Sequence, residues 1–294
     1  MTAVDTGTPG PVGAGAGSPR LRRRARRGPD DTGARPLTRW SGTGLGVAVL
    51  WLSLLVLLPL AAVVVKAAGL GVGGFWAAIT QHDAVSTLLL TVGASAVVTV
   101  VNAVFGTVIA WVLARDTFPG QRLVGLVIDI PFALPTIVAG LVMLSLYGPN
   151  SPVHLNLYAT KPGVVVSLLF VTLPFVVRTV QPVLEVLDRD AEQAARSLGA
   201  GGFVVFRRVV LPAILPALVS GMALAFARAI GEYGSMILIS GGLPGTTVAS
   251  MYVYNQIQVD RLGNAAAVST ELLVIAVLVI VLMTSLQRWV ARRG

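Results

Sequence analysis

The sequence has no cysteine, only two histidines and little charge. The missing cysteine excludes disulfides and thiolate metal sites. His82 and His154 both fall in expected loops, where a lone histidine is ordinarily solvated, so no metal site is predicted. Charged residues make up 12% of the chain and hydrophobic residues 55%, whereas a soluble domain carries about 25% charge. This composition indicates a polytopic membrane protein.

The sequence also lacks a phosphate-binding loop of the ATPase type. That motif requires glycine before a lysine and serine or threonine after it, but Lys66 and Lys161 stand in Val-Lys-Ala and Thr-Lys-Pro. If ATP powers this protein, we expect ATP and magnesium on a partner ATPase and no cofactor on this chain. No catalytic residue is predicted, because the carboxylates expected inside the membrane have no obvious partner for a catalytic dyad; these are Glu185, Glu232 and Glu271.

Six apolar stretches are long enough to cross a membrane, since a transmembrane helix needs about 20 mostly apolar residues. They are Leu45–Ala68, Ser86–Leu113, Leu123–Tyr147, Gly163–Leu187, Leu211–Ser240 and Ala265–Leu286. We therefore expect an all-α integral membrane fold with six transmembrane helices. Three of these stretches contain two prolines each, which predict kinks or helix starts, or alternatively the bent helices of a gate. The prolines are Pro131, Pro135, Pro174, Pro182, Pro212 and Pro216.

The chain is predicted to divide into four parts. Residues 1–40 form a disordered basic tail, 41–82 the first transmembrane helix with an outer loop, 83–288 the membrane core, and 289–294 a short tail. The first 40 residues hold eight arginines, a pattern also seen in nucleic-acid-binding segments. Because they are rich in Gly, Pro, Ala and Thr, we prefer a tail that attracts anionic membrane lipid, and expect no nucleic-acid partner.

The distribution of basic residues predicts the orientation. With the N-terminus inside, the inner segments carry seventeen of the 22 lysines and arginines. The outer connections carry only Lys161 and Arg261, with Lys66 at a helix end. Both termini are therefore expected in the cytoplasm, in a multi-pass protein of the bacterial plasma membrane, with the loop at 188–212 also cytoplasmic.

The fifth apolar stretch combines rows of small residues with two charges. The small residues recur every fourth position, which predicts close helix packing; they are Ala223, Ala227, Gly231 and Ser235 in one row and Gly221, Ala225 and Ala229 in another. Arg228 and Glu232 are four residues apart, so they are predicted to pair. Charges at this depth face protein or water, so the pair either lines the path of an ion or locks the helix to its neighbours. Arg178 and Glu271 could join this network, or Arg178 could lie at the cytoplasmic end.

A long charged interruption separates the fourth and fifth stretches. Asp190 is placed to cap a helix whose third position is Gln193. Ala191–Leu198 contains good helix formers, and Gly199 can end the helix in a left-handed cap. A second short helix is expected over Phe203–Val210. Two ordered helices in an exposed loop predict that a soluble protein docks there.

This loop resembles the signature of importer-type ABC transporter permeases, which reads Glu-Ala-Ala, three residues, Gly, nine residues, Ile-x-Leu-Pro. The matching segments are Gln193-Ala194-Ala195, Gly199 and Val209-Val210-Leu211-Pro212. The spacing is the same, but Gln193 stands in the Glu position, with Glu192 just before it, and Val209 replaces Ile. The departure puts in doubt any role that needs a carboxylate at 193, but not the helix.

Three further stretches are similar to the oxyanion permeases, above all to the T-type subunit of the sulfate/thiosulfate importer. They are Tyr147–Asn150, Thr172–Pro182 and Phe226–Ser235, the last shared with molybdate permeases. The resemblance spans roughly Leu50 to Trp289 and leaves out the basic tail.

The resemblance implies the fold of a type I ABC importer permease and the import of sulfate and thiosulfate, with molybdate or tungstate as the alternative. It implies a second permease subunit, of the related W type, two cytoplasmic ATPases and an extracytoplasmic oxyanion-binding protein. The ATPase-coupling residues would be Glu192, Gln193, Ala194, Ala195, Gly199, Val209, Leu211 and Pro212, and the transport-path candidates Arg178, Arg228, Glu232 and Tyr233. Two other classes remain open: an intramembrane enzyme built on Glu232 and Arg228, and an anion channel or ion-coupled carrier.

Overall fold

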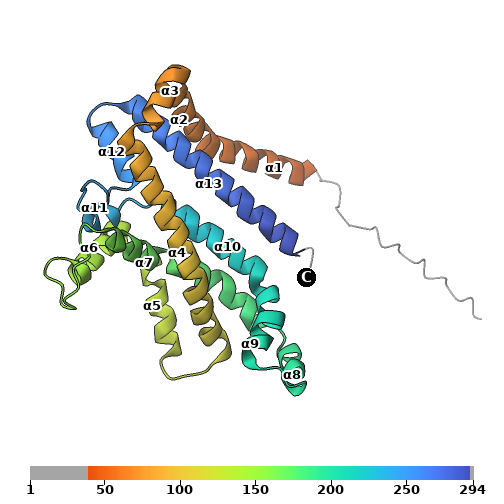
Figure 1. Cartoon of the computed structure of the whole chain (residues 1–294). Helices are drawn as coiled ribbons and strands as arrows, with labels where there is room; N and C mark the ends of the chain where they lie inside the picture. The colour runs from red at the N-terminus through yellow and green to blue at the C-terminus, as the bar shows by residue number, and fades with distance from the viewer. Residues whose placement is uncertain (1–38, 292–294) are drawn as a thin grey trace, which may run out of the picture. The chain divides into compact units, whose positions relative to one another are not determined.

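The computed structural model describes residues 39–291, which form helices joined by turns and loops (Figure 1). The described residues up to Trp51 belong to one unit, and a second compact unit begins at Leu52. Residues 1–38 of the predicted basic tail lie outside the described residues, and so do residues 292–294 of the predicted C-terminal tail.

Within residues 39–291, five helical stretches are long and apolar enough to cross a membrane. They are Gly42–Ala68, which contains α1 (Arg39–Leu52, from residue 42) and α2 (Leu58–Ala68); α4 (His82–Arg115); α7 (Lys161–Val186); Gly202–Ile230, which contains α10 (Leu211–Ile230); and Leu262–Trp289 in α13 (Leu262–Ala291). The short helix α3 (Gly71–Ile79) precedes α4. These stretches match five of the six that the sequence predicts.

The sixth predicted span, Leu123–Tyr147, is not one continuous helix. It consists of α5 (Gln121–Ala133) and α6 (Thr136–Tyr147), which meet at 116°. The break falls at Pro135, which lacks the N–H that a helix needs, and Leu134 before it is extended, as a residue before proline prefers. The described part of the chain therefore has six spans only if this bent pair crosses the membrane as one.

The second short helix predicted in the charged loop is not separate from the fifth span. Helix α9 (Gly202–Val205) runs through a π-helical turn, Phe206–Val210, directly into α10. The Leu211 N–H donates to the Phe206 carbonyl, five residues back. In an α-helix the ring of Pro212 would clash with a carbonyl one turn earlier, and the wider π turn relieves that clash. A second π turn, Ser53–Leu57, also stands just before a proline, Pro59.

Helix α10 ends at Ile230, ten residues before the predicted end of the fifth span. The turn at 231–235, the short helix α11 (Met236–Ile239) and α12 (Ala249–Gln258) follow it. Of the two predicted rows of small residues, only the row of Gly221, Ala225 and Ala229 is buried throughout. A Cβ at Gly221 would lie 3.1 Å from the Cα of Val176, so α10 and α7 pack backbone to backbone there.

The core lies where α4, α7 and α10 meet. One buried cluster joins these three helices with α5, and a second joins α4 and α7 with α6, α11 and α12. Helix α4 approaches α7 closely at Gly106, where a Cβ would lie 2.9 Å from the Val176 side chain. This three-helix core supports two irregular segments, the charged loop after α7 and the turn after α10.

Candidate functional site

The charged loop begins with a short capped helix, α8 (Arg189–Ser197). The Asp188 Oδ1 accepts a hydrogen bond from the Asp190 N–H at 2.9 Å, and α8 starts at the next residue, Arg189. The predicted cap, Asp190 with Gln193 at the third position, is therefore wrong by two residues. The reason is that α7 ends at Val186 and only Leu187 separates it from the capping residue, so no linker remains.

The end of α8 agrees with the sequence prediction. Gly199 has φ +84°, in the left-handed region. Its N–H donates to the Arg196 carbonyl at 2.9 Å, and the Ala200 N–H donates to the Ala195 carbonyl at 3.1 Å. These two bonds form a Schellman cap, which satisfies carbonyls that the helix end would otherwise leave without partners. Helix α8 is thus capped at both ends.

A buried ion pair holds α8 against the end of α4. The Arg115 guanidinium contacts the Glu192 carboxylate, and each side chain is only 8% exposed. Arg115 also donates to the Leu187 carbonyl at 3.4 Å and lies 5.9 Å from the centre of the Trp111 ring. Sequence reasoning named Glu192 but missed Arg115, because nothing local relates two residues 77 positions apart.

The remaining residues of the sequence motif lie either on the outer face of α8 or around the π turn that connects α9 to α10. Gln193 and Ala194 are exposed and Ala195 is partly buried, so Gln193 presents an uncharged side chain to the outside. Val209 and Leu211 are partly buried and Pro212 is exposed around the π turn. The Phe206 ring meets Trp111 of α4 edge-on, with centres 5.6 Å apart. The motif therefore forms one ordered unit attached to α4 and α10.

The turn at 231–235 contains the other charged candidates. Arg228 Nη1 lies 2.6 Å from Glu232 Oε2, so the predicted pair is confirmed. Glu232 is only 2% exposed although it lies beyond the end of α10. Its Oε1 accepts from both the N–H and the Oγ of Ser235, at 3.0 Å each. The carboxylate thus neutralises Arg228 and holds the turn closed.

Helix α6 packs directly on this turn. A Cβ at Gly234 would lie 2.1 Å from Thr136 Oγ1, and a Cβ at Gly140 would lie 2.8 Å from the Ser235 Cα. The Tyr233 ring packs against Tyr254 of α12, with centres 5.3 Å apart. The turn joins α6, α10 and α12.

Arg178 belongs to a different pair from the one considered in the sequence. Its Nε and Nη2 lie 2.7 Å and 2.5 Å from the two carboxylate oxygens of Asp129 in α5. It also donates to Gln181 Oε1 and to the Gly125 carbonyl, at 3.0 Å each. Of the two alternatives for Arg178, the shared network with Arg228 is not what the structure shows, since Arg178 pairs with Asp129 and Arg228 with Glu232; its place at the cytoplasmic end stays a prediction. Sequence reasoning missed Asp129, although an acidic residue inside an apolar stretch is itself a signal of a buried partner.

The two arginines predicted as transport-path candidates, Arg178 and Arg228, are thus both paired with carboxylates. The Arg228 side chain is 31% exposed, and those of Arg178 and Asp129 are 35% and 43% exposed. Among residues 39–291, no group of three or more His, Asp or Glu could hold a metal ion. The site can offer paired charges and hydrogen-bonding groups to a polar solute, but the described residues give no nucleophile–base arrangement.

The chain is similar in sequence to known membrane transport proteins. Residues 104–293 match the family described as "Binding-protein-dependent transport system inner membrane component". The chain is 40% identical over 251 residues to the sulfate transport system permease protein CysT of Synechocystis, covering 83% of this chain and 88% of the relative. It is 38% identical over 257 residues to the CysT of Salmonella typhimurium, covering 85% and 93%.

A solved structure has the same fold at low sequence identity. It is the crystal structure of a bacterial alginate ABC transporter in complex with an alginate-pentasaccharide-bound periplasmic protein. The TM-score is 0.71 at 14% identity, and the match covers 85% of this chain and 94% of that chain.

Replacing Glu192 tests how α8 is held. Glu192→Gln leaves Arg115 buried without its counter-charge, a change that typically costs about 3–5 kcal/mol. We expect hydrogen exchange of the amides at 190–198 to rise at least ten-fold. Gln193→Glu, at the exposed neighbouring position, should leave the exchange of these amides within two-fold of wild type. Equal exchange in wild type and Glu192→Gln would contradict the anchoring role.

Replacing Glu232 tests how the turn is held. Glu232→Gln keeps a side-chain acceptor for Ser235 but removes the charge beside Arg228. We expect the detergent-solubilised protein to melt several degrees lower, because loss of a buried partner typically costs about 3–5 kcal/mol. Glu185→Gln, at an exposed carboxylate on α7, is the control. If both variants melt like wild type, the pair does not stabilise the fold.

Proposed function

Because this chain belongs to the family of binding-protein-dependent transport system inner membrane components, and so is the membrane-spanning permease subunit of an ABC importer, we propose that it carries sulfate into the cell. The substrate assignment rests on sequence identity to two permeases named for sulfate transport. The identity is 40% and 38%, over more than four-fifths of the chain. Thiosulfate, a tetrahedral oxyanion of the same charge, is proposed as a second substrate. Molybdate or tungstate import is the alternative within this fold.

Energy would enter through the loop at 188–212. The sequence contains no phosphate-binding loop, so two cytoplasmic ATPase subunits, with their ATP and magnesium, would each receive one such loop. The exposed face of α8, with Gln193 and Ala194, would contact the ATPase. A helix capped at Asp188 and Gly199 can transmit displacement as a rigid body, and the pair of Glu192 with Arg115 would pass it to α4. The continuous helix from α9 into α10 would carry it into the membrane.

The other partners follow from the same assignment. The family description supports an extracytoplasmic binding protein that delivers the anion. A second permease subunit, of the related W type, would complete the pore. The excess of basic residues on one set of segments supports cytoplasmic termini. The loop at 188–212 would then face the ATPases, and the turn at 231–235 would lie on the transport path or beside it.

Neutralised arginines suit a protein that must release its anion. A doubly charged anion beside an unpaired arginine in a low-dielectric environment would be held strongly. Transport needs binding that is strong enough for entry and weak enough for exit. The pairs Arg178–Asp129 and Arg228–Glu232 reduce the net attraction while leaving polar groups within reach. Tyr233, neutral and hydroxyl-bearing, would donate a hydrogen bond without adding charge.

Uptake by a strain that lacks this gene tests the substrate. We expect uptake of radiolabelled sulfate and thiosulfate to fall at least ten-fold and to return when the gene is supplied. Molybdate uptake should stay at the level of the parent strain. Normal sulfate and thiosulfate uptake with impaired molybdate uptake would replace the sulfate assignment by the alternative. Sulfate uptake that survives loss of the partner ATPase would favour a channel or ion-coupled carrier.

Two glycines in the loop provide a matched test of coupling. A Cβ would meet no atom within 4 Å at Gly199 or at Gly201, but only Gly199 has a positive φ, whereas Gly201 has φ −66°. Valine is strongly disfavoured in the left-handed region, which costs an ordinary residue roughly 1–2 kcal/mol. We therefore expect Gly199→Val to lower sulfate uptake at least ten-fold at a normal amount of protein in the membrane, and Gly201→Val to lower it less than two-fold. Equal effects of the two substitutions would show that the cap of α8 is not needed.

A further inference from the structure

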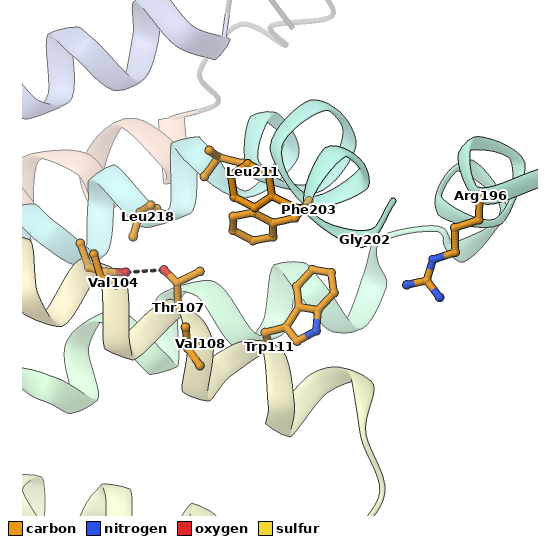
Figure 2. A pocket seen from close by; sticks show the side chains of 11 residues that line it. Val104, Thr107, Val108, Trp111, Arg196, Gly202, Phe203, Leu211 and Leu218 are labelled. Atoms are coloured by element: carbon orange, nitrogen blue, oxygen red, sulfur yellow. Dashed lines mark hydrogen bonds between the residues drawn. The ribbon is translucent and has the colours of Figure 1, made fainter. Parts of the chain in front are cut away.

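An apolar groove runs along α4 on its way to the charged loop. It has a volume of about 620 Å³. Its α4 wall includes Val104, Val108 and Trp111, and Phe203 and Leu211 line it from the other side (Figure 2). Val104, Val108 and Phe203 are 57%, 56% and 75% exposed. The three α4 residues lie on one face of the helix, over about 10 Å at 1.5 Å per residue.

A polar cleft continues this groove at its charged end. The cleft has a volume of about 270 Å³ and shares Trp111 and Arg196 with the groove. Its other lining residues are Arg115, Asp116, Arg189, Glu192 and Gln193. Figure 2 shows Arg196 at the end of the groove beyond Trp111. The two spaces therefore form one amphipathic site, apolar along α4 and polar under α8.

The polar end of this site carries a net positive charge. It holds three arginines against two carboxylates, and one of each is used in the buried pair of Arg115 with Glu192. Within the part of the chain that the structure describes, Arg189 and Arg196 form no ion pair. Trp111 stands at the junction, a residue type that prefers the boundary between hydrocarbon and water.

The geometry points to a binding site for an anionic phospholipid. One acyl chain lies in the groove between α4 and α9–α10, and the phosphate of the headgroup lies between Arg189 and Arg196. Basic pockets beside spanning helices bind anionic headgroups in this way, and an apolar groove on a spanning helix excludes a purely polar ligand. The site goes beyond the proposed transport function and does not depend on which anion is carried.

The position of the site gives the lipid a structural consequence. Its apolar part contacts α4 and the start of the fifth span, and its polar part contacts α8. Two of these elements, α4 and α8, are already joined by Arg115 and Glu192. The bound lipid would add a second connection between α8 and the membrane-spanning helices.

Native mass spectrometry of the full-length chain, purified with its partner subunits, tests the charged end. Phosphatidylglycerol and phosphatidylcholine with identical acyl chains are added separately. We expect wild type to prefer phosphatidylglycerol at least ten-fold, and Arg189→Gln with Arg196→Gln to lose about five-fold for each arginine removed. Arg122→Gln, at an exposed position outside the site, is the matched control. An equal loss in the control, or no loss in the double variant, would overturn the proposal.

A second pair of variants tests the apolar end of the site. Val108→Trp fills the groove and should lower retention of both lipids at least five-fold. Val100→Trp, on the same helix and equally exposed at 58%, should leave retention unchanged. Equal retention in the two variants would overturn the placement of the acyl chain. Displacement of phosphatidylglycerol by an equal concentration of free sulfate would make the cleft an oxyanion site and would also overturn the lipid assignment.

A photo-crosslinking amino acid at Val108, activated in membranes that contain the assembled transporter, identifies the occupant directly. We expect an adduct with the mass of a phospholipid. An adduct to a neighbouring subunit or to residues 1–38 of this chain would show that protein covers the groove and would overturn the proposal.

Discussion

Every backbone N–H and C=O inside an apolar membrane needs a partner within the protein, and this constraint shapes the irregular points of the membrane-spanning part of the chain. At Pro135 the bent pair α5–α6 breaks where no N–H is available. Ahead of Pro212 a π turn keeps the helix bonded. At 231–235 the Glu232 carboxylate accepts the N–H of Ser235. In the exposed loop, where this constraint does not apply, the cap at Gly199 also satisfies two carbonyls of α8. The interruptions that a proposed transport function needs are therefore all internally bonded.

Arginine–carboxylate pairs connect these irregular points to the three-helix core. Arg115 ties α8 to α4, Arg178 ties α7 to α5, and Arg228 ties the end of α10 to the turn that follows it. The helices of the core contact one another through small residues, with Gly106 of α4 and Gly221 of α10 both against Val176 of α7. Removing one partner of the buried pair Arg115–Glu192, or of Arg228 with the buried Glu232, is expensive, so these two pairs favour one arrangement of their segments.

A coupled importer needs an exposed element that moves as a unit and a firm connection from it to the membrane. Helix α8 has the first property through its two caps and the second through Glu192. The uninterrupted helix Gly202–Ile230 gives a direct route from the loop to the turn at 231–235. The proposed lipid site lies against both elements. In this arrangement the exposed face around Gln193 is left for a partner, while the neighbouring Glu192 is used internally.

The sequence by itself determined the membrane class, five of the six spans, the left-handed cap at Gly199 and the pairing of Arg228 with Glu232. These features are set by local composition, by a single residue's backbone preference or by the spacing along one helix. Only the tertiary structure decided that α5 and α6 meet at 116°, that Arg178 pairs with Asp129, and that Glu192 pairs with Arg115. The sequence also could not show that Asp188, and not Asp190, caps α8, because the end of α7 fixes where α8 begins. These outcomes depend on which helices become neighbours, and ion pairs between residues 49 and 77 positions apart have no periodicity that a sequence could display.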